Sequence, residues 1–395
     1  EISLYFQWKL LCDRAYLAAT IQSFYFAGMY FGALTGGWLA DNFRRNSTMF
    51  IGTKGMALAS LGSSFSDAIS LLRFIVGFFQ MGVNVTYFVY AIEILGQKHR
   101  TLGGQLAGFL WSIGYSGTAL FAYLIRDWRM LIIAVRVPGL IFVLLWRIFP
   151  ATPRWLIAHN RLDEAYSVLL KFGSKDSKPI DEQALRELIE NVRQDQLERH
   201  KVDDKRYTML DLVRTRKLRK RSFILFCTWL VCAIVHFGLF LYVTSMPGNL
   251  YNSYVMNIIT FPKSLEMVMR LAQFNTIRTL YTHTLVLSTE HSVIITVFAI
   301  LGKSFMSVTF MNALLYGTEL FPTVVRSNAL ACGTMISRLG VILTPYIAML
   351  GQLPNYGMYV PATMFGVLTL VGAIMSLWLP ETLFAKLSQT VEEAE

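Results

Sequence analysis

The sequence has few charged residues for its length. Asp, Glu, Lys and Arg make up 15% of its 395 residues, whereas a soluble domain carries roughly 25%. Hydrophobic residues make up 54%, and the mean hydropathy is +0.46. This balance excludes an ordinary soluble domain and indicates a protein that folds in lipid.

Cysteine and clustered metal ligands are also scarce. The chain has four cysteines, too few for the disulfide framework of a small secreted domain. The nearest histidine pair, His283 and His291, has no third ligand at a suitable spacing, and no nucleophile stands with a base. We therefore expect no enzyme, no metal and no cofactor.

Apolar segments of about 20 residues, the length that crosses a ~30 Å hydrocarbon core as a helix, recur along the chain. They are continuous rather than alternating, which favours helices over a barrel. We expect an all-α membrane protein with spans near residues 18–40, 48–66, 71–95, 103–125, 130–150, 222–245, 250–269, 292–320, 327–350 and 357–380.

The net charge of +11 is concentrated in one polar segment. Of the 36 Lys and Arg, 18 lie between Arg147 and Arg221, among 12 acidic residues. No nucleic-acid-binding motif accompanies them, so a solvated loop beside anionic lipid explains the charge better than a nucleic-acid partner. The positive-inside rule places this loop and the C-terminus in the cytoplasm. We expect an N-terminal transmembrane bundle at 1–150, a basic cytoplasmic loop at 151–221, a C-terminal transmembrane bundle at 222–385 and a cytoplasmic tail at 386–395. The loop is expected to contain helices, because "DEQALRELIENVRQDQLERH" has a helical texture.

Two charged pairs with the same spacing indicate an internal repeat. "IEILGQKHR" ends one apolar segment with Glu93 and Arg100, and "TELFPTVVR" ends another with Glu319 and Arg326. "FPATPRWL" follows the first pair and "LPETL" follows the second at a similar distance. Both pairs fall on the positively charged side, so we expect two bundles related by an axis along the membrane normal. We interpret the pairs as a gate; ordinary helix-end salt bridges are the alternative.

The repeat predicts more helices than the chain supplies. The first copy has five spans, and "EISLYFQWKLLCDR" at the start is too short and too polar to form a sixth. In the second copy "TLYTHTLVLST" is too short to cross a bilayer. We expect a parent protein of two six-helix bundles, with the first span and part of the ninth absent from this chain.

Several motifs resemble a known family. "GGWLADNFRRN" resembles the G-x-L-A-D-R-x-G-R-R loop of major facilitator transporters: Gly37, Asp41 and Arg45 match, whereas Asn42 and Arg44 replace an arginine and a glycine. "IEILG", "AYLIRDWRML", "PATPRWLI", "TELFPTVVR", "SRLGVILTPY" and "LPETL" together resemble the organic cation, carnitine and organic anion transporter family, most closely its carnitine and zwitterion branch. The resemblance implies a major facilitator fold, a monomer in the plasma membrane and transport of small organic ions, with sodium coupling left open.

Ionisable residues inside apolar segments are the first candidates for a substrate site, since a charge is costly in lipid. Arg338 lies well inside a span, and the resemblance implies that it meets a carboxylate; a structural ion pair is the alternative. Lys303 is a second candidate, again against internal pairing. His236 stands where relatives carry tyrosine, and packing is its alternative.

Aromatic residues would hold the ammonium group of a zwitterion by cation–π attraction. Trp229 lies two helical turns before His236 on one face, beside Phe237. Packing against lipid or core is the alternative for such rings. Other spans contribute Phe24, Tyr87 and the polar candidate Asn84.

Small residues recur at every fourth position in Gly28, Gly32 and Gly36. Such a stripe lets helices approach closely and slide; static packing is the alternative.

Together these residues predict a facilitator that binds a zwitterion through Arg338 and nearby rings and works by alternating access. The inner gate is expected to comprise Asp41, Arg45, Glu93, Arg100, Glu319 and Arg326. The altered "DNFRRN" loop leaves a non-transporting receptor as an alternative, and an organic anion exchanger or an organic cation uniporter also remains open.

Overall fold

The computed structural model describes residues 15–65, 68–95, 120–173, 182–202, 214–245, 323–352 and 359–380. It also describes isolated residues between 110 and 118, residue 212 and isolated residues between 309 and 321. Throughout this part of the chain the regular secondary structure is helical, as the continuous apolar segments predicted.

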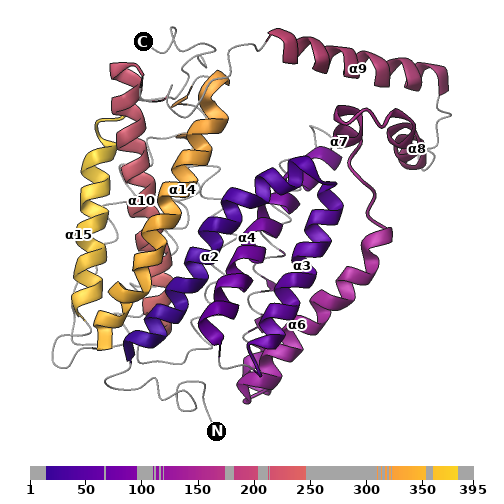
Figure 1. The fold of residues 1–395 in the computed structure, drawn as a ribbon. Coiled ribbons are helices and arrows are strands. Elements are labelled where there is room, and N and C mark those ends of the chain that lie inside the picture. The colour runs from indigo at the N-terminus through magenta and orange to yellow at the C-terminus, as the bar shows by residue number, and fades with distance from the viewer. Residues whose placement is uncertain are drawn as a thin grey trace.

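Long helices form two groups that stand side by side (Figure 1). The first group contains α2 (Ala15–Asn42), α3 (Arg45–Gly62), α4 (Ile69–Ile94) and α6 (Trp128–Leu144), the last continued by the 3-10 turn η3 (Leu145–Arg147). The second group contains α10 (Arg216–Ser245), α14 (Thr323–Met349), the 3-10 turn η5 (Leu350–Gln352) and α15 (Tyr359–Ser376). Each helix falls on a predicted span.

Three of the described helices contain segments long and apolar enough to cross a membrane by length and composition alone: Ile69–Ala91, Arg216–Leu241 and Asn328–Met349. Of the remaining predicted spans, 103–125, 250–269 and 292–320 lie wholly or largely outside the described residues.

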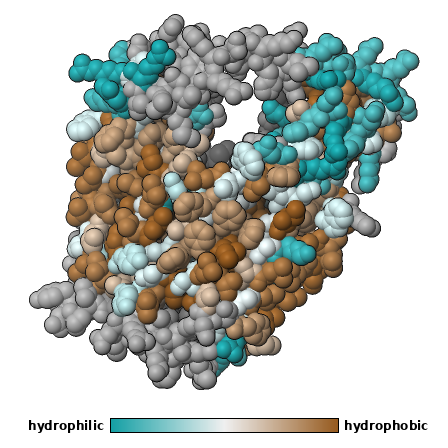
Figure 2. Space-filling view, in the orientation of Figure 1, coloured by the Kyte–Doolittle hydropathy of each residue, from teal (hydrophilic) through white to brown (hydrophobic). Residues whose placement is uncertain are grey.

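A polar layer closes one end of the first group. It is built by α7 (Pro153–Ala158), α8 (Leu162–Gly173) and α9 (Glu182–Val202). Figure 2 shows hydrophilic side chains over this layer and hydrophobic ones over the long helices beneath it. Trp155, Leu156, Ala165 and Ile189 give the layer a small core of its own. The helices expected in the basic segment are present, and they share this core.

Glycines bring α2 and α4 into backbone contact. A Cβ atom added to Gly28 would lie 2.0 Å from the carbonyl oxygen of Phe74, and one added to Gly77 would lie 2.1 Å from that of Tyr25. Helices at this spacing interlock and leave no room for a larger residue. Helices α2 and α4 both belong to the first group, so the glycine stripe holds two neighbouring helices of one group together. This favours the static-packing interpretation of the stripe.

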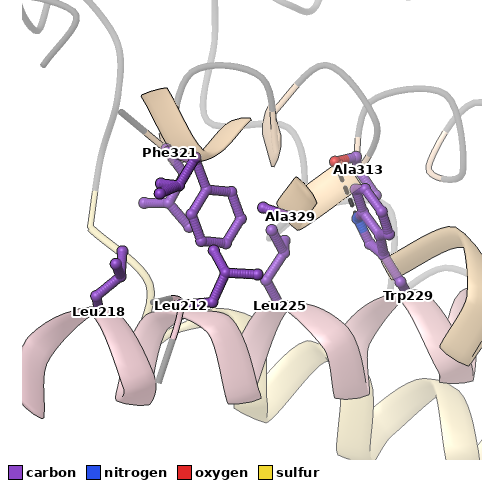
Figure 3. Packing of buried hydrophobic residues seen from close by; sticks show 9 residues of the cluster. Leu212, Leu218, Leu225, Trp229, Ala313, Phe321 and Ala329 are labelled. Atoms are coloured by element: carbon purple, nitrogen blue, oxygen red, sulfur yellow. Dashed lines mark hydrogen bonds between the residues drawn. The ribbon is translucent and has the colours of Figure 1, made fainter. Parts of the chain in front are cut away.

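The second group packs around the indole of Trp229 on α10. This side chain is 3% exposed, and its Nε1–H donates to the carbonyl oxygen of Ala313 at 3.0 Å (Figure 3). A Cβ atom on Gly333 would lie 2.1 Å from the ring. The indole thus fills the space between α10 and α14, in a cluster with Leu225 and Phe321.

The two groups meet where α2 lies beside α14 (Figure 1). The Ser23 hydroxyl donates to the carbonyl oxygen of Ile342 at 2.8 Å. Phe26 and Met29 of α2 pack with Val341 of α14 and with Ala233 of α10. The contact surface is mainly apolar.

One contact occurs in both halves of the sequence. The Tyr90 hydroxyl donates to the carbonyl oxygen of Pro150 at 3.0 Å, and the Tyr316 hydroxyl donates to that of Pro380. Each tyrosine precedes by three positions the glutamate of its predicted charged pair. The repeat inferred from the motifs thus has a matching hydrogen bond in each copy.

Candidate functional site

Arg338 lies on α14 at the contact between the two groups. Its guanidinium carbon is 5.7 Å from the centroid of the Phe237 ring on α10, and its charge interacts with the Tyr25 phenol on α2. Among the residues that the structure describes, no carboxylate pairs with Arg338, and none accepts a hydrogen bond from it. The predicted alternative, a structural ion pair, has no partner in this part of the chain.

Aromatic rings surround the Phe237 side of this arginine. Phe237 makes edge-on contacts with Phe26, at 5.7 Å between ring centroids, and with His236, at 5.2 Å. His236 has further contacts of its own. Helices α2 and α10 thus place rings beside the half-buried cation of α14, an arrangement that suits both a carboxylate and an apolar or cationic group beside it.

The other predicted binding residues do not gather here. Trp229 lies in the closed core of the second group, where its ring has no free face, so the structure favours its packing role. Phe24, Asn84 and Tyr87 are exposed on α2 and α4. Lys303 lies outside the described residues. Substrate binding by Phe24, Asn84, Tyr87 and Lys303 remains a prediction.

Three residues of this region were missed by sequence reasoning: Tyr25, Arg73 of α4 and Arg136 of α6. The Tyr25 phenol interacts electrostatically with Arg136, Arg73 and Arg338. The Nε–H of Arg136 donates to Oγ of Ser60 on α3 at 3.1 Å. A signal was available, because each arginine interrupts an apolar run, in "LLRFIV" and "AVRVPG".

At the polar end of the first group, Arg45 forms a buried ion pair with Glu93. Nη2 of Arg45 is 3.1 Å from Oε1 of Glu93, and the two side chains are 13% and 6% exposed. The Thr152 hydroxyl donates to Oε2 of the same carboxylate at 2.7 Å. Arg45 and Glu93, two residues of the predicted gate, are therefore brought together in a pairing that the sequence did not predict.

The remaining gate predictions are not tested. Arg100 and Glu319 lie outside the described residues, and only the helical backbone is described for Asp41 and Arg326. Their roles as gate residues stay predictions.

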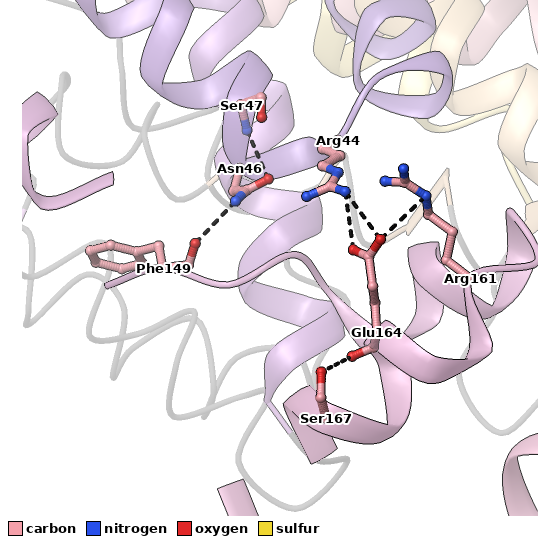
Figure 4. Close-up of polar contacts among 7 residues, drawn as sticks. All are labelled: Arg44, Asn46, Ser47, Phe149, Arg161, Glu164 and Ser167. Carbon is pink, nitrogen blue, oxygen red and sulfur yellow. Dashed lines mark hydrogen bonds and ion pairs between the residues drawn. The ribbon is translucent and has the colours of Figure 1, made fainter. Parts of the chain in front are cut away.

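The loop between α2 and α3 is tied to the polar layer. Nη2 of Arg44 is 3.0 Å from Oε2 of Glu164 on α8, and Nε of Arg161 is 3.5 Å from Oε1 of the same carboxylate (Figure 4). Nδ2 of Asn46 donates to the carbonyl oxygen of Phe149 at 3.0 Å. In the described part of the chain these contacts stay within the first group and its layer. Together with the Arg45–Glu93 ion pair, they connect α3, α4 and α8.

Two groups of membrane helices that meet beside a half-buried cation, with a polar layer at one end, define a membrane transport protein of the major facilitator fold. The inward open structure of the xylose transporter XylE from E. coli shares this fold, with a TM-score of 0.69 at 16% identity, covering 96% of this chain and 90% of that one. The sugar (and other) transporter family model matches residues 12–262.

Curated relatives identify the family more closely. The chain is 31% identical to the organic cation transporter protein of Drosophila melanogaster, over 98% of this chain and 73% of that protein. It is 30% identical to organic cation/carnitine transporter 2 and to solute carrier family 22 member 7 of Homo sapiens, over 98% of this chain and 71% and 72% of those proteins. The chain therefore belongs to the solute carrier family 22 of organic ion transporters, within the major facilitator superfamily. Its relatives are membrane transporters and not enzymes.

Proposed function

We propose that this protein carries small organic ions that bear a carboxylate, carnitine-like zwitterions among them, across the plasma membrane by alternating access. Relatives named for organic cation and carnitine transport support the substrate class. In this proposal the bundles occupy 1–150 and 222–385, the basic segment 151–221 and the tail 386–395 lie in the cytoplasm, and the protein acts as a monomer.

The observation that carries the proposal is the position of Arg338. Arg338 is half-buried inside a predicted membrane span, where a guanidinium is costly unless an anion compensates it, and no described carboxylate does so. A guanidinium binds a carboxylate through two parallel hydrogen bonds, and the neighbouring Phe237 ring offers a face to the rest of the molecule. The site stands between the two groups, where transporters built from repeats place their substrates.

Alternating access requires two bodies that move against each other. The interlocked α2 and α4, together with the ion pairs that join α3, α4 and α8, make the first group one rigid body. Its described contact with the second group is mainly apolar and contains the Ser23 hydrogen bond to Ile342. Such a surface can be broken and remade at modest cost, so we place the moving interface along α2, α10 and α14.

A screen of uptake into cells tests the proposal, with labelled organic cations, anions and zwitterions supplied with and without sodium. We expect saturable uptake of carboxylate-bearing ions by the wild-type protein and by Arg154→Gln, a control at an exposed arginine of the polar layer. If no ion shows saturable uptake although a normal amount of protein reaches the cell surface, the result would instead support the alternative of a non-transporting receptor.

A further inference from the structure

One end of the second group carries a dense cluster of cations. Six of the eight residues from Arg214 to Arg221 are Lys or Arg, and none of the eight is acidic. They lead directly into α10, whose segment Arg216–Leu241 is long and apolar enough to cross a membrane. Figure 2 shows hydrophilic side chains at this end of the second group, above a hydrophobic surface. The positive charge is therefore concentrated where a membrane helix begins.

Three of these cations lie together on one exposed face of α10. Arg216, Arg219 and Lys220 are spaced as i, i+3 and i+4, which makes their side chains neighbours on a helix. All three are exposed, and no residue in the described part of the chain forms an ion pair or side-chain hydrogen bond with them. Like charges at these spacings repel one another. An anion that contacts several of them at once would relieve this repulsion.

The opposite face of α10 fixes the orientation of the three cations. Leu218 and Leu225 are buried in the core cluster of the second group. The hydroxyl of Ser222, also buried, donates to the carbonyl oxygen of Leu212 at 3.4 Å. Because residues 218, 222 and 225 share one helix face, turning the cations inward would break this core. The cations therefore stay on the outside of the group.

Exposed aromatic rings lie beside the cations, toward the apolar part of the group. Phe223 follows Lys220 by three positions, so it continues the same face of α10, and its side chain is 66% exposed. Trp378, just after the end of α15, is exposed to the same extent, and its neighbour Leu379 packs on the core cluster of the second group. Exposed rings at a boundary between apolar and charged surface are typical of the headgroup level of a bilayer. This position favours a membrane lipid over a soluble anion.

We propose that Arg216, Arg219 and Lys220 bind the headgroup of a membrane lipid that carries several phosphates, of the phosphoinositide class. One such headgroup compensates several cations, whereas singly charged lipids would have to crowd around one helical turn. Arginine binds phosphate through two parallel hydrogen bonds, and lysine binds it as a point charge. Basic clusters at the cytoplasmic end of a membrane helix suit such lipids. The proposal therefore rests on the orientation proposed above, but not on transport.

A titration with short-chain lipids tests the site. We would add dioctanoyl phosphatidylinositol bisphosphate to the purified protein in detergent and follow the rise in its melting temperature, which reports binding without requiring transport. Dioctanoyl phosphatidylserine supplies a single net charge on the same acyl chains, and free inositol trisphosphate supplies the headgroup without them. The wild type should bind the bisphosphate lipid at least about tenfold more tightly than phosphatidylserine, and also more tightly than the free headgroup.

Two triple variants separate the site from the overall charge of the protein. Neutralising the patch with Arg216→Gln, Arg219→Gln and Lys220→Gln should lower affinity for the bisphosphate lipid by at least about tenfold. The matched control removes three exposed cations that lie elsewhere and should keep the wild-type affinity: Arg126→Gln, Arg129→Gln and Arg154→Gln.

Equal losses in the two triple variants, or equal wild-type affinities for the two lipids, would overturn the site, because binding would then follow net charge alone. Free inositol trisphosphate that binds as tightly as the lipid would overturn the assignment to a membrane lipid. If the triple patch variant does not fold, Arg219→Gln alone provides the test and should lower affinity by about fivefold.

The orientation and the transport function are tested separately from the site. Labelling of Lys217→Cys above the wild-type level by a membrane-impermeant maleimide outside intact cells would overturn the orientation, and with it the choice of a cytoplasmic lipid. If the patch-dependent lipid preference is present but the cell screen detects no uptake, the lipid site stands and the transport function fails.

Discussion

Neutralising Glu93 tests whether the buried pair with Arg45 stabilises the first group of helices. At 3.1 Å, the attraction of two unit charges is about 5 kcal/mol with an effective dielectric constant of about 20. Part of it is offset by desolvation, and removal of one partner of such a buried pair costs about 3–5 kcal/mol. Because Arg45 keeps some exposure, we expect Glu93→Gln to lower stability by about 3 kcal/mol.

Glu164 provides the matched control, because its ion pair with Arg44 in a solvated setting is 3.0 Å long, close to the 3.1 Å of the Arg45–Glu93 pair. There the side chains are 39% and 45% exposed, and such a pair is worth about 0–1 kcal/mol. The assay heats the purified variants in detergent and measures the fraction that remains monodisperse. Glu93→Gln should lower the apparent melting temperature by about 3–4 °C, and Glu164→Gln by about 1 °C or less. Equal shifts for the two variants would refute the reasoning from burial.

Two further variants test the packing. A methyl group at Gly28 would collide with the backbone of Phe74, whereas one at Gly37 would meet nothing within 4 Å, so Gly28→Ala should sharply reduce the yield of folded protein and Gly37→Ala should not; similar yields would contradict the interlocked packing. Trp229→Phe removes the hydrogen bond to Ala313 and should cost about 1–3 kcal/mol of stability without changing which ions compete for uptake. A change in selectivity with an unchanged melting temperature would show that Trp229 binds substrate and would contradict its packing role.

Hydropathy and charge predicted most of the architecture, because length and polarity alone decide which segments cross a bilayer. The helical texture of the basic segment predicted α9, and the repeated motifs predicted the correspondence now seen in the Tyr90 and Tyr316 hydrogen bonds. These features are local or periodic, so a single sequence contains them.

The site was predicted only in part, because its composition depends on which faces of the helices meet. An apolar membrane helix shows no clear inner face in its sequence, so Trp229 could not be distinguished from a lining residue. Glu93 pairs with Arg45 only because α3 packs against α4, which spacing along the chain does not reveal. Arg73 and Arg136 were visible as charges inside apolar runs and were overlooked beside Arg338.

The most direct test of the central claim compares carnitine with choline, which has the quaternary ammonium but no carboxylate. Uptake of each into proteoliposomes would be measured for the wild type and for Arg338→Gln. If Arg338 binds the carboxylate, the variant should lose at least about tenfold in kcat/KM for carnitine and show no loss for choline. Unchanged carnitine kinetics, or an equal loss for both compounds, would contradict the account.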